Sequence, residues 1–304
     1  MSSRSPGPPT GIRWPLVLCV VIAAAAETPR KGEGAAGARM QPSVFDESAA
    51  YERFMGRWSR QLAPLLVEFA GIGEGDAVLD VGSGTGALTQ AIVEAVPSAR
   101  VVGVDPAAAY VAYAQAHVPD GRARFLVGDA QQLDLADATF DRVASLLVMN
   151  FIPDPSKALR EMIRVTRPDG VIAAAVWDYG EGMQMLRLFW DEAVARDPAI
   201  AARDERNMPL CKPGELAAMW RRHGLALVDE RPLSIVMSFT SFDDYWAPFL
   251  GGQGPAGAYV AGLNETERAA LRLRLRRRLV GDGEDRPISL QARAWAVRGV
   301  VPPR

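Results

Sequence analysis

The feature that most constrains the fold is a regular alternation of short apolar runs with helical stretches between residues 77 and 177. The apolar runs are residues 78–81, 101–105, 125–129, 140–147 and 171–177. Between them, apolar residues such as Leu88, Ile92 and Ala95 recur at helical spacing. Strands that are apolar along their whole length, and that alternate with helices, are typical of a parallel sheet covered on both faces. The sequence therefore predicts a doubly wound α/β fold.

The alternation stops after Asp178, where mainly helical segments begin. The pattern predicts helices over residues 182–196 and 213–222, β-type runs over 225–228 and 234–239, a helical insertion over 242–280 and a last strand over 290–297. The absence of a low-complexity linker favours one domain over residues 40–304, with helical cap segments at about residues 180–222 and 240–285.

Composition excludes several classes of protein. The chain has 304 residues, 49% of them hydrophobic, and 34 basic against 36 acidic side chains, which suits a folded protein and makes nucleic acid an improbable partner. The two cysteines, Cys19 and Cys211, have no metal-ligand spacing, so we expect neither a metal site nor a disulfide framework. The arginine-rich segment 268–278 has two interpretations, a solvated helix face, which we favour, and a surface for anions or lipid headgroups.

The first 39 residues differ from the rest of the chain. Arg4 and Arg13 precede an apolar run over residues 14–26 with small residues at its end, which is typical of a secretory signal and too short to span a bilayer. Two alternatives are a start codon assigned too far upstream, with the protein beginning at Met40, which we favour, and a disordered tail. The expected location is the cytoplasm, or outside it if the segment is a true signal. We expect no stable membrane insertion.

Three predicted strands end in a carboxylate. Asp80 opens the glycine-rich turn Gly82-Ser83-Gly84-Thr85-Gly86, while Asp105 and Asp129 end the second and third strands. Glycines let a ligand approach the backbone closely, and a carboxylate at the end of the second strand can accept both hydroxyl groups of a ribose. Open α/β sheets bind ligands at this carboxyl edge, so we expect the three acids to surround one site.

These segments resemble the class I S-adenosylmethionine-dependent methyltransferases, in particular methyltransferase type 11 and the ubiquinone/menaquinone C-methyltransferases. The resemblance covers about residues 45–178 and is carried by 78–86, 104–105, 128–130, 140–143 and 167–170. It implies a mostly parallel seven-stranded sheet with an antiparallel last strand, for which residues 291–297 are the candidate.

The resemblance also implies the ligand and the roles of individual residues. The cofactor is S-adenosyl-L-methionine: the glycine turn would hold its methionine part, Asp105 and the adjacent Pro106 its ribose, and Asp129 with Ala130 its adenine. The backbone near Leu146 would border the methionine amino group and the substrate. A helix over residues 51–60 would close over the site, with Tyr51 or Arg57 reaching the cofactor carboxylate.

The expected reaction is transfer of the methyl group to a small organic molecule by in-line displacement, which depends mainly on alignment. The sequence identifies no catalytic base, since His117 and His223 both lie near predicted helix ends. Trp177, Tyr179 and Trp246 are the candidates for the acceptor pocket. Two alternatives stay open: an NAD(P)-dependent oxidoreductase, for which Gly86 comes one residue early in the glycine pattern, and a binding protein of the same fold without turnover. The sequence leaves the oligomeric state and the methyl acceptor undetermined.

Overall fold

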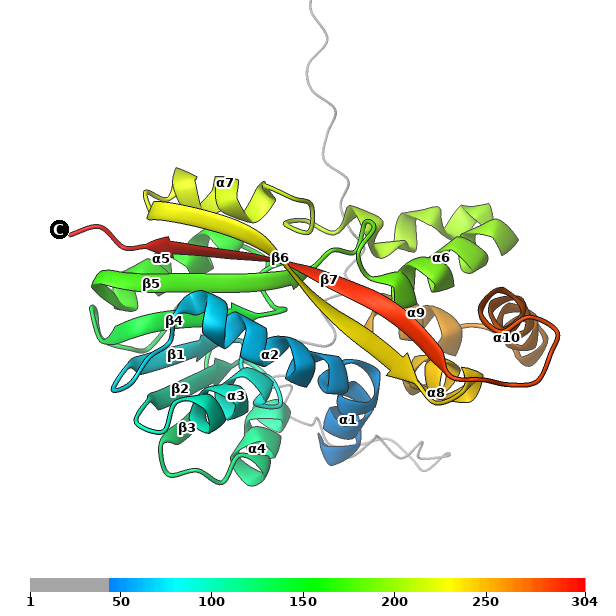
Figure 1. Cartoon of the computed structure of the whole chain (residues 1–304), viewed down its shortest axis with the longest axis horizontal. Helices are drawn as coiled ribbons and strands as arrows, with labels where there is room; N and C mark the ends of the chain where they lie inside the picture. Colours follow the sequence, from blue (N-terminus) through cyan, green and yellow to red (C-terminus); the bar gives the residue numbers. More distant parts are fainter. Residues whose placement is uncertain (1–43, 304) are drawn as a thin grey trace, which may run out of the picture.

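The structure, a computed structural model, describes residues 44–303. The expectations about residues 1–39 and Met40 lie outside this range. The described chain contains a seven-stranded sheet with the order β3-β2-β1-β4-β5-β7-β6 (Figure 1). The strands are β1 (Ala77–Val81), β2 (Arg100–Asp105), β3 (Ala123–Val127), β4 (Phe140–Leu146), β5 (Thr166–Trp177), β6 (Ala226–Phe239) and β7 (Ile288–Val300).

The sheet is parallel except for its last strand. Strands β1 to β5 pair in parallel, and β7 lies antiparallel between β5 and β6. The predicted α/β sheet with an antiparallel last strand is therefore confirmed. From β1 the chain continues to β2 on one side, and from β4 it continues to β5 on the other side. The strand order therefore reverses between β1 and β4, and open α/β sheets bind ligands in the crevice at such a point.

Helices cover both faces of the sheet. Helices α2, α3 and α4 lie on one face, and α5 and α7 on the other (Figure 1). The helices are α1 (Val44–Tyr51), α2 (Arg57–Ala70), α3 (Ala87–Ala95), α4 (Ala108–His117), α5 (Pro155–Val165), α6 (Gln184–Arg196), α7 (Glu215–Arg222), α8 (Phe242–Trp246), α9 (Gly254–Ala261) and α10 (Glu265–Leu279). A π-helical turn, η2 (Glu52–Gly56), joins α1 to α2, and short 3-10 turns are η3 (Pro198–Arg203), η4 (Glu205–Asn207) and η5 (Ala247–Gly251).

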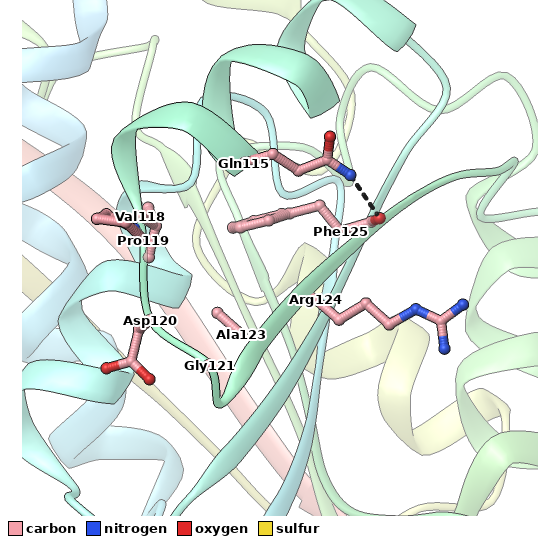
Figure 2. Close-up of a pocket in the computed structure, with 8 residues that line it drawn as sticks. All are labelled: Gln115, Val118, Pro119, Asp120, Gly121, Ala123, Arg124 and Phe125. Atoms are coloured by element: carbon pink, nitrogen blue, oxygen red, sulfur yellow. Dashed lines mark hydrogen bonds between the residues drawn. The ribbon is translucent and has the colours of Figure 1, made fainter.

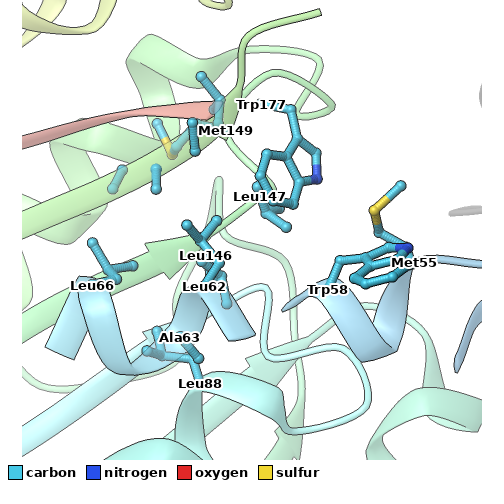
Figure 3. Packing of buried hydrophobic residues seen from close by; sticks show 14 of the residues in the cluster. Met55, Trp58, Leu62, Ala63, Leu66, Leu88, Leu146, Leu147, Met149 and Trp177 are labelled. Carbon is cyan, nitrogen blue, oxygen red and sulfur yellow. The ribbon is translucent and has the colours of Figure 1, made fainter. Parts of the chain in front are cut away.

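One layer of the core lies between the sheet and α2. Figure 3 shows Leu62, Ala63 and Leu66 of α2 near Leu146, the last residue of β4. These α2 side chains are fully buried. Burying a leucine side chain contributes about 1.5–3 kcal/mol, so the N-terminal helix is an integral part of the sheet domain.

A cap of helices lies beyond the carboxyl ends of the parallel strands. Helices α6, α8, α9 and α10 gather there (Figure 1), around an aromatic cluster in which Phe189 and Phe249 stack with ring centroids 4.6 Å apart. The Tyr245 hydroxyl donates a hydrogen bond to the Met185 carbonyl at 2.9 Å. A capping box formed by Asn264 and Glu267 begins α10.

The boundaries differ from the predicted ones in three places. Helix α7, expected within the cap segment 180–222, packs on β6 and β7 of the sheet, and its Trp220 indole donates to the Ile172 carbonyl of β5 at 3.1 Å. The two β-type runs after Gly224 form one strand, β6, because the residues between them, 229–233, pair in regular register with β7; the register shift lies earlier, between Ala226 and Asp229. The strand predicted from the run 171–177 begins earlier, at Thr166, and residues 167–170 form a bulge within β5, with Asp169 at a φ of 62°.

No helix among the described residues is long and apolar enough to cross a membrane.

Candidate active site

A cavity of about 460 Å³ lies at the carboxyl edge of the sheet. One part of its wall comes from the ends of β1, β2, β3, β4 and β5 and the turns that follow them. The remaining wall comes from the N-terminal helical segment, through residues such as Tyr51 and Met55, and from the cap. The cavity therefore has a sheet side and a cap side.

The glycine-rich turn forms the floor on the sheet side. The amides of Gly82 and Ser83 both donate to the Val104 carbonyl of β2, at 2.8 and 3.0 Å. The Gly84 amide donates to Oδ2 of Asp105 at 2.9 Å. These bonds attach the turn after β1 to the end of β2, so its backbone has a fixed position against the cavity.

The three glycines of the turn serve different purposes. All three have positive φ, but a Cβ added at Gly82 would come within 2.5 Å of Val148, and one added at Gly86 within 3.0 Å of Val118. A Cβ at Gly84 would meet no protein atom within 4 Å, although Gly84 lines the cavity. Gly82 and Gly86 are thus required by packing, whereas Gly84 leaves room on the cavity side.

Asp105 is held by two backbone amides. Its Oδ2 accepts from Gly84 and its Oδ1 from Ala107, each at 2.9 Å. Burial raises the pKa of this carboxyl, while the two amides oppose that shift. Each carboxylate oxygen has two lone pairs, so both can accept a further hydrogen bond from a ligand.

Asp80 and Ser83 carry buried polar atoms without partners. Oδ2 of Asp80 accepts from the Thr89 hydroxyl at 2.7 Å, but its Oδ1 has no hydrogen-bond partner. The buried Ser83 hydroxyl also has no hydrogen-bond partner. Burial raises the pKa of Asp80 to about 7. Unpartnered buried polar groups are costly, and both residues line the cavity, which is consistent with a polar ligand at this end.

Asp129 lies two residues beyond β3 and is exposed. Its Oδ1 accepts from the amide of Gln131 at 2.8 Å. Ala130 beside it is buried, and both residues line the cavity. The carboxylates after β1, β2 and β3 therefore surround one space.

The ends of β4 and β5 form the wall between the two sides. Leu147 has a φ of 64°, unusual for a residue other than glycine, and its amide donates to the Ala175 carbonyl at 2.8 Å. Trp177 and Tyr179 follow on β5 and just after it, both almost fully buried. Strained backbone of this kind concentrates at functional sites.

The cap contributes one acidic side chain to the cavity. Glu205, the first residue of η4, is 4% exposed and lines the wall together with Tyr179 and Leu186. Its Oε2 accepts from the Trp190 indole at 2.7 Å. Burial raises its pKa to about 7.

A second hollow lies at the opposite edge of the sheet. It is lined by the end of α4 and the start of β3, including Gln115, whose side-chain amide donates to the Phe125 carbonyl at 3.3 Å (Figure 2). Asp120 at its rim is bound to Arg122. This hollow is at the amino ends of the strands, away from the converging carboxylates.

The central part of the chain matches a known protein family. Residues 79–174 match the family model described as "Methyltransferase domain". Residues 79–174 therefore form a methyltransferase domain. Over 151 residues the chain is 32% identical to a demethylmenaquinone methyltransferase of Renibacterium salmoninarum. The aligned segment covers 50% of this chain and 60% of that protein.

Other relatives of the methyltransferase domain have different names. A malonyl-[acyl-carrier protein] O-methyltransferase of Hahella chejuensis is 31% identical over 126 residues, 41% of this chain and 45% of that protein. The chain spans about half the length of the curated relatives it matches. These matches favour methyl transfer over the nicotinamide-dependent alternative.

Solved structures share the fold of the methyltransferase domain. A phosphoethanolamine N-methyltransferase of Haemonchus contortus, in complex with S-adenosyl-L-methionine, aligns with a TM-score of 0.52 at 19% identity over 86% of this chain and 57% of that one. The YcgJ protein of Bacillus subtilis aligns with a TM-score of 0.53 at 20% identity over 80% of this chain and 99% of that one.

Most residues predicted from the sequence meet in the cavity of the methyltransferase domain. The cavity brings together Asp80, Gly82, Gly84, Asp105, Pro106, Asp129, Ala130, Leu146, Tyr51, Trp177 and Tyr179. Three of the predicted residues, Gly86, Arg57 and Trp246, are not in its lining.

Each of these three has another partner. Gly86 packs beside Val118 and Ala114, and Trp246 is buried in the cap near Phe249. The Arg57 guanidinium donates to Oδ1 of Asp244 at 2.9 Å and lies 4.2 Å from the ring centroid of Trp58. Arg57 therefore joins α2 to α8 and lies outside the lining of the cavity, and its contact with the cofactor carboxylate stays a prediction.

The sequence predicts that residues 51–60 close over the site, but it does not identify Glu205, Phe54 or Met55 as lining residues. Glu205 stands in the run Asp204-Glu205-Arg206, which is typical of a solvated loop, so only the fold reveals that its side chain is buried. Phe54 and Met55 of η2 also line the cavity. The two histidines lie outside it: His117 stacks on Tyr113, and His223 contacts the Met219 carbonyl.

Proposed function

We propose that this protein transfers a methyl group from S-adenosyl-L-methionine to a small organic acceptor. The observation that carries the proposal is the convergence of Gly84, Asp105 and Asp129 on one cavity of the methyltransferase domain. Relatives that act on small molecules by name, such as the demethylmenaquinone methyltransferase, support it. When bound, this cofactor supplies a methyl group on a sulfonium sulfur, and the sulfur leaves as a neutral thioether when an acceptor attacks the methyl carbon.

The residues at the sheet side fit the cofactor. Gly84 leaves the space that a Cβ would fill, and the Asp105 oxygens have lone pairs available for the two ribose hydroxyls. The unpartnered Oδ1 of Asp80 and hydroxyl of Ser83 can receive the polar methionine end. Asp129 and Ala130 would border the adenine.

Positioning is the main task of the protein in such a reaction, because a direct displacement requires nucleophile, carbon and leaving group in a line. The strained turn at Leu147 and the buried Trp177 line the cavity where its sheet side meets its cap side. Tyr51, Phe54 and Met55 close the cavity from the N-terminal side. These apolar walls exclude water from the reacting atoms.

The acceptor enters from the cap side. The wall there is apolar and aromatic, with Trp177, Tyr179 and Leu186, and a cavity of about 460 Å³ is suited to a small molecule. We propose that nucleic acid is not a partner, given the formal net charge of −2, and that the protein works in the cytoplasm, where its cofactor is made.

Two measurements test this function. Isothermal titration with S-adenosylhomocysteine, the demethylated cofactor, should show micromolar binding and no response to NAD(H); the reverse result would refute methyl transfer. Incubation of a metabolite extract with methyl-labelled cofactor should yield a labelled small molecule. A cofactor that binds without any labelled product would favour a binding protein without turnover.

A further inference from the structure

Glu205 is a buried acid at the cap end of the cavity, and nothing in the recognition of the cofactor calls for it. It begins η4, in the loop that connects α6 to α7, and its side chain lines the same wall as Tyr179 and Leu186. Tyr51, of the N-terminal helical segment, lines the same cavity. Glu205 therefore belongs to the acceptor side.

Only one oxygen of Glu205 is used by the protein. Oε2 accepts the hydrogen bond of the Trp190 indole at 2.7 Å. Oε1 has no hydrogen bond within residues 44–303, and it is not among the fully enclosed unpartnered atoms. The carboxyl group thus has one anchored oxygen and one that faces the cavity.

The loop holds Glu205 without neutralising it. The neighbouring Asp204 is bound by the guanidinium of Arg187 and also by Arg206, which fixes the loop against α6. Within the described chain no ion pair reaches Glu205 itself. Arg187 is committed to Asp204, so a structural counterion role does not explain the buried acid.

The surroundings of Glu205 place its pKa near neutral pH. Burial raises its pKa to about 7, against the hydrogen bond from Trp190 and the positive charge of Arg187, while Asp204 adds to the rise. The other ionisable groups facing it are Tyr179 and Cys211, and burial raises the pKa of both well above neutrality. Glu205 is the group in this cluster that can exchange a proton near pH 7.

We propose that Glu205 is the catalytic base of the proposed methyl transfer and that the acceptor presents a phenol-type hydroxyl to its free oxygen. The inference rests on the proposed function. A carboxylate of this kind can remove a proton from a phenol, whose pKa of about 10 is within reach, but not from the much weaker acid of an aliphatic alcohol. The cavity that Glu205 lines also has aromatic and apolar walls, including Phe151 and Trp177, which suit a flat ring.

The step balances as follows. The acceptor oxygen forms a bond to the methyl carbon while the bond from that carbon to sulfur breaks, and its electron pair stays on the neutral sulfur. The hydroxyl proton passes to the Glu205 carboxylate and then to solvent. The products are a methyl ether and the demethylated cofactor, and no oxidant or metal is needed.

The first test uses 2-naphthol as a probe, with the protein saturated with S-adenosylhomocysteine. Between pH 6 and pH 8.5 the probe remains a neutral phenol while Glu205 ionises. We expect 2-naphthol to bind about tenfold more tightly at the higher pH, because ionised Glu205 accepts its hydroxyl proton in a hydrogen bond. In E205Q the affinity should not depend on pH, and E181Q, an exposed loop control, should behave as the unmodified protein does.

The matched ligand is 2-methoxynaphthalene, which keeps the ring system and lacks the hydroxyl. Its binding should not strengthen with pH. Removing the anchoring hydrogen bond with Trp190→Phe should move the pH dependence of 2-naphthol binding upward, because that bond lowers the pKa of Glu205. A merely structural role for Glu205 would not produce this shift.

Cofactor affinity separates failure of this inference from failure of the proposed function. If S-adenosylhomocysteine does not bind the unmodified protein, the proposed function fails. If it binds, the inference is overturned when E205Q keeps the pH dependence, when the two naphthalene ligands bind alike at pH 8.5, or when 2-naphthol shows no binding at millimolar concentration.

Discussion

The acidic residues at the carboxyl edge differ in what surrounds each of them. Asp105 is bound by two backbone amides, and Asp129 is exposed beside Gln131. Asp80 and Glu205 are buried, each with a pKa raised to about 7. Similar side chains at one edge are thus suited to different tasks, hydrogen bonding to a ligand for the first two and proton exchange for Glu205.

Asp105→Ala tests the ribose contact at the residue scale. Without this carboxylate, ligand hydroxyls are left unpaired in a closed site, so the affinity for S-adenosylhomocysteine should fall by about 2 kcal/mol or more. Isothermal titration measures the change. The exposed Asp134→Ala, outside the cavity lining, should bind normally; equal affinities in both variants, with the fold intact, would remove Asp105 from the site.

The buried acid Glu205 predicts a pH dependence of stability. Folded Glu205 keeps its proton to about pH 7 whereas the unfolded chain loses it near pH 4.5, so this group lowers the free energy of unfolding as the pH rises between those values. E205Q should therefore gain stability relative to the unmodified protein between pH 4.5 and pH 8, by about 3 kcal/mol. Urea unfolding at the two pH values measures it.

Glu161→Gln is the control with the opposite sign. Glu161 is bound by Arg164, which holds its pKa below the usual range, so its contribution is present at neutral pH and is lost as the pH falls through its folded-state pKa. Glu161→Gln should lose stability relative to the unmodified protein as the pH rises. The same trend in both variants would contradict the assigned environments.

At the scale of elements, the glycine turn is the part of the fold that touches the cofactor in our account. Gly84→Ala places a methyl group in the cavity, so the affinity for S-adenosylhomocysteine should fall at least about tenfold. Gly71→Ala at the end of α2 is its match, with φ of 64° against 51° and no protein atom within 4 Å of the added Cβ. Each variant should lose about 1 kcal/mol of stability, but only Gly84→Ala should lose affinity. Parallel affinity losses would refute the assignment.

The link between α2 and α8 is the other element-scale contact open to test. A double-mutant cycle with Arg57→Ala and Asp244→Ala should give a coupling of about 1 kcal/mol or less, because both side chains are more than a quarter exposed. The two single variants should have equal effects on cofactor affinity. Loss of binding in Arg57→Ala alone would support the direct contact with the cofactor carboxylate that the sequence suggested.

Local patterns predict the sheet and half of the cavity, for physical reasons. The parallel strands and the turn from Asp80 to Gly86 can be predicted from short stretches of sequence, because burial of a strand and a positive φ each restrict the residue type. The role of Arg57 and the burial of Glu205 depend on how the cap packs against the sheet. Such contacts join residues far apart in sequence, for example Arg57 with Asp244, and no local pattern specifies them.

The whole molecule combines a sheet that provides a cofactor end with a cap that provides an acceptor end. Aromatic packing around Phe249 holds the cap together, and the bond from Tyr245 to Met185 joins α8 to α6. The N-terminal helical segment closes the cavity between the two ends through Tyr51 and Met55.

A crystal structure of the complex with S-adenosylhomocysteine tests the central claim most directly. We expect the ribose hydroxyls on the Asp105 carboxylate, the adenine beside Asp129 and Ala130, and the sulfur atom directed toward the side of the cavity that holds Tyr179 and Glu205. A ligand bound away from the carboxyl edge, or bound there without contact to Asp105, would contradict the account.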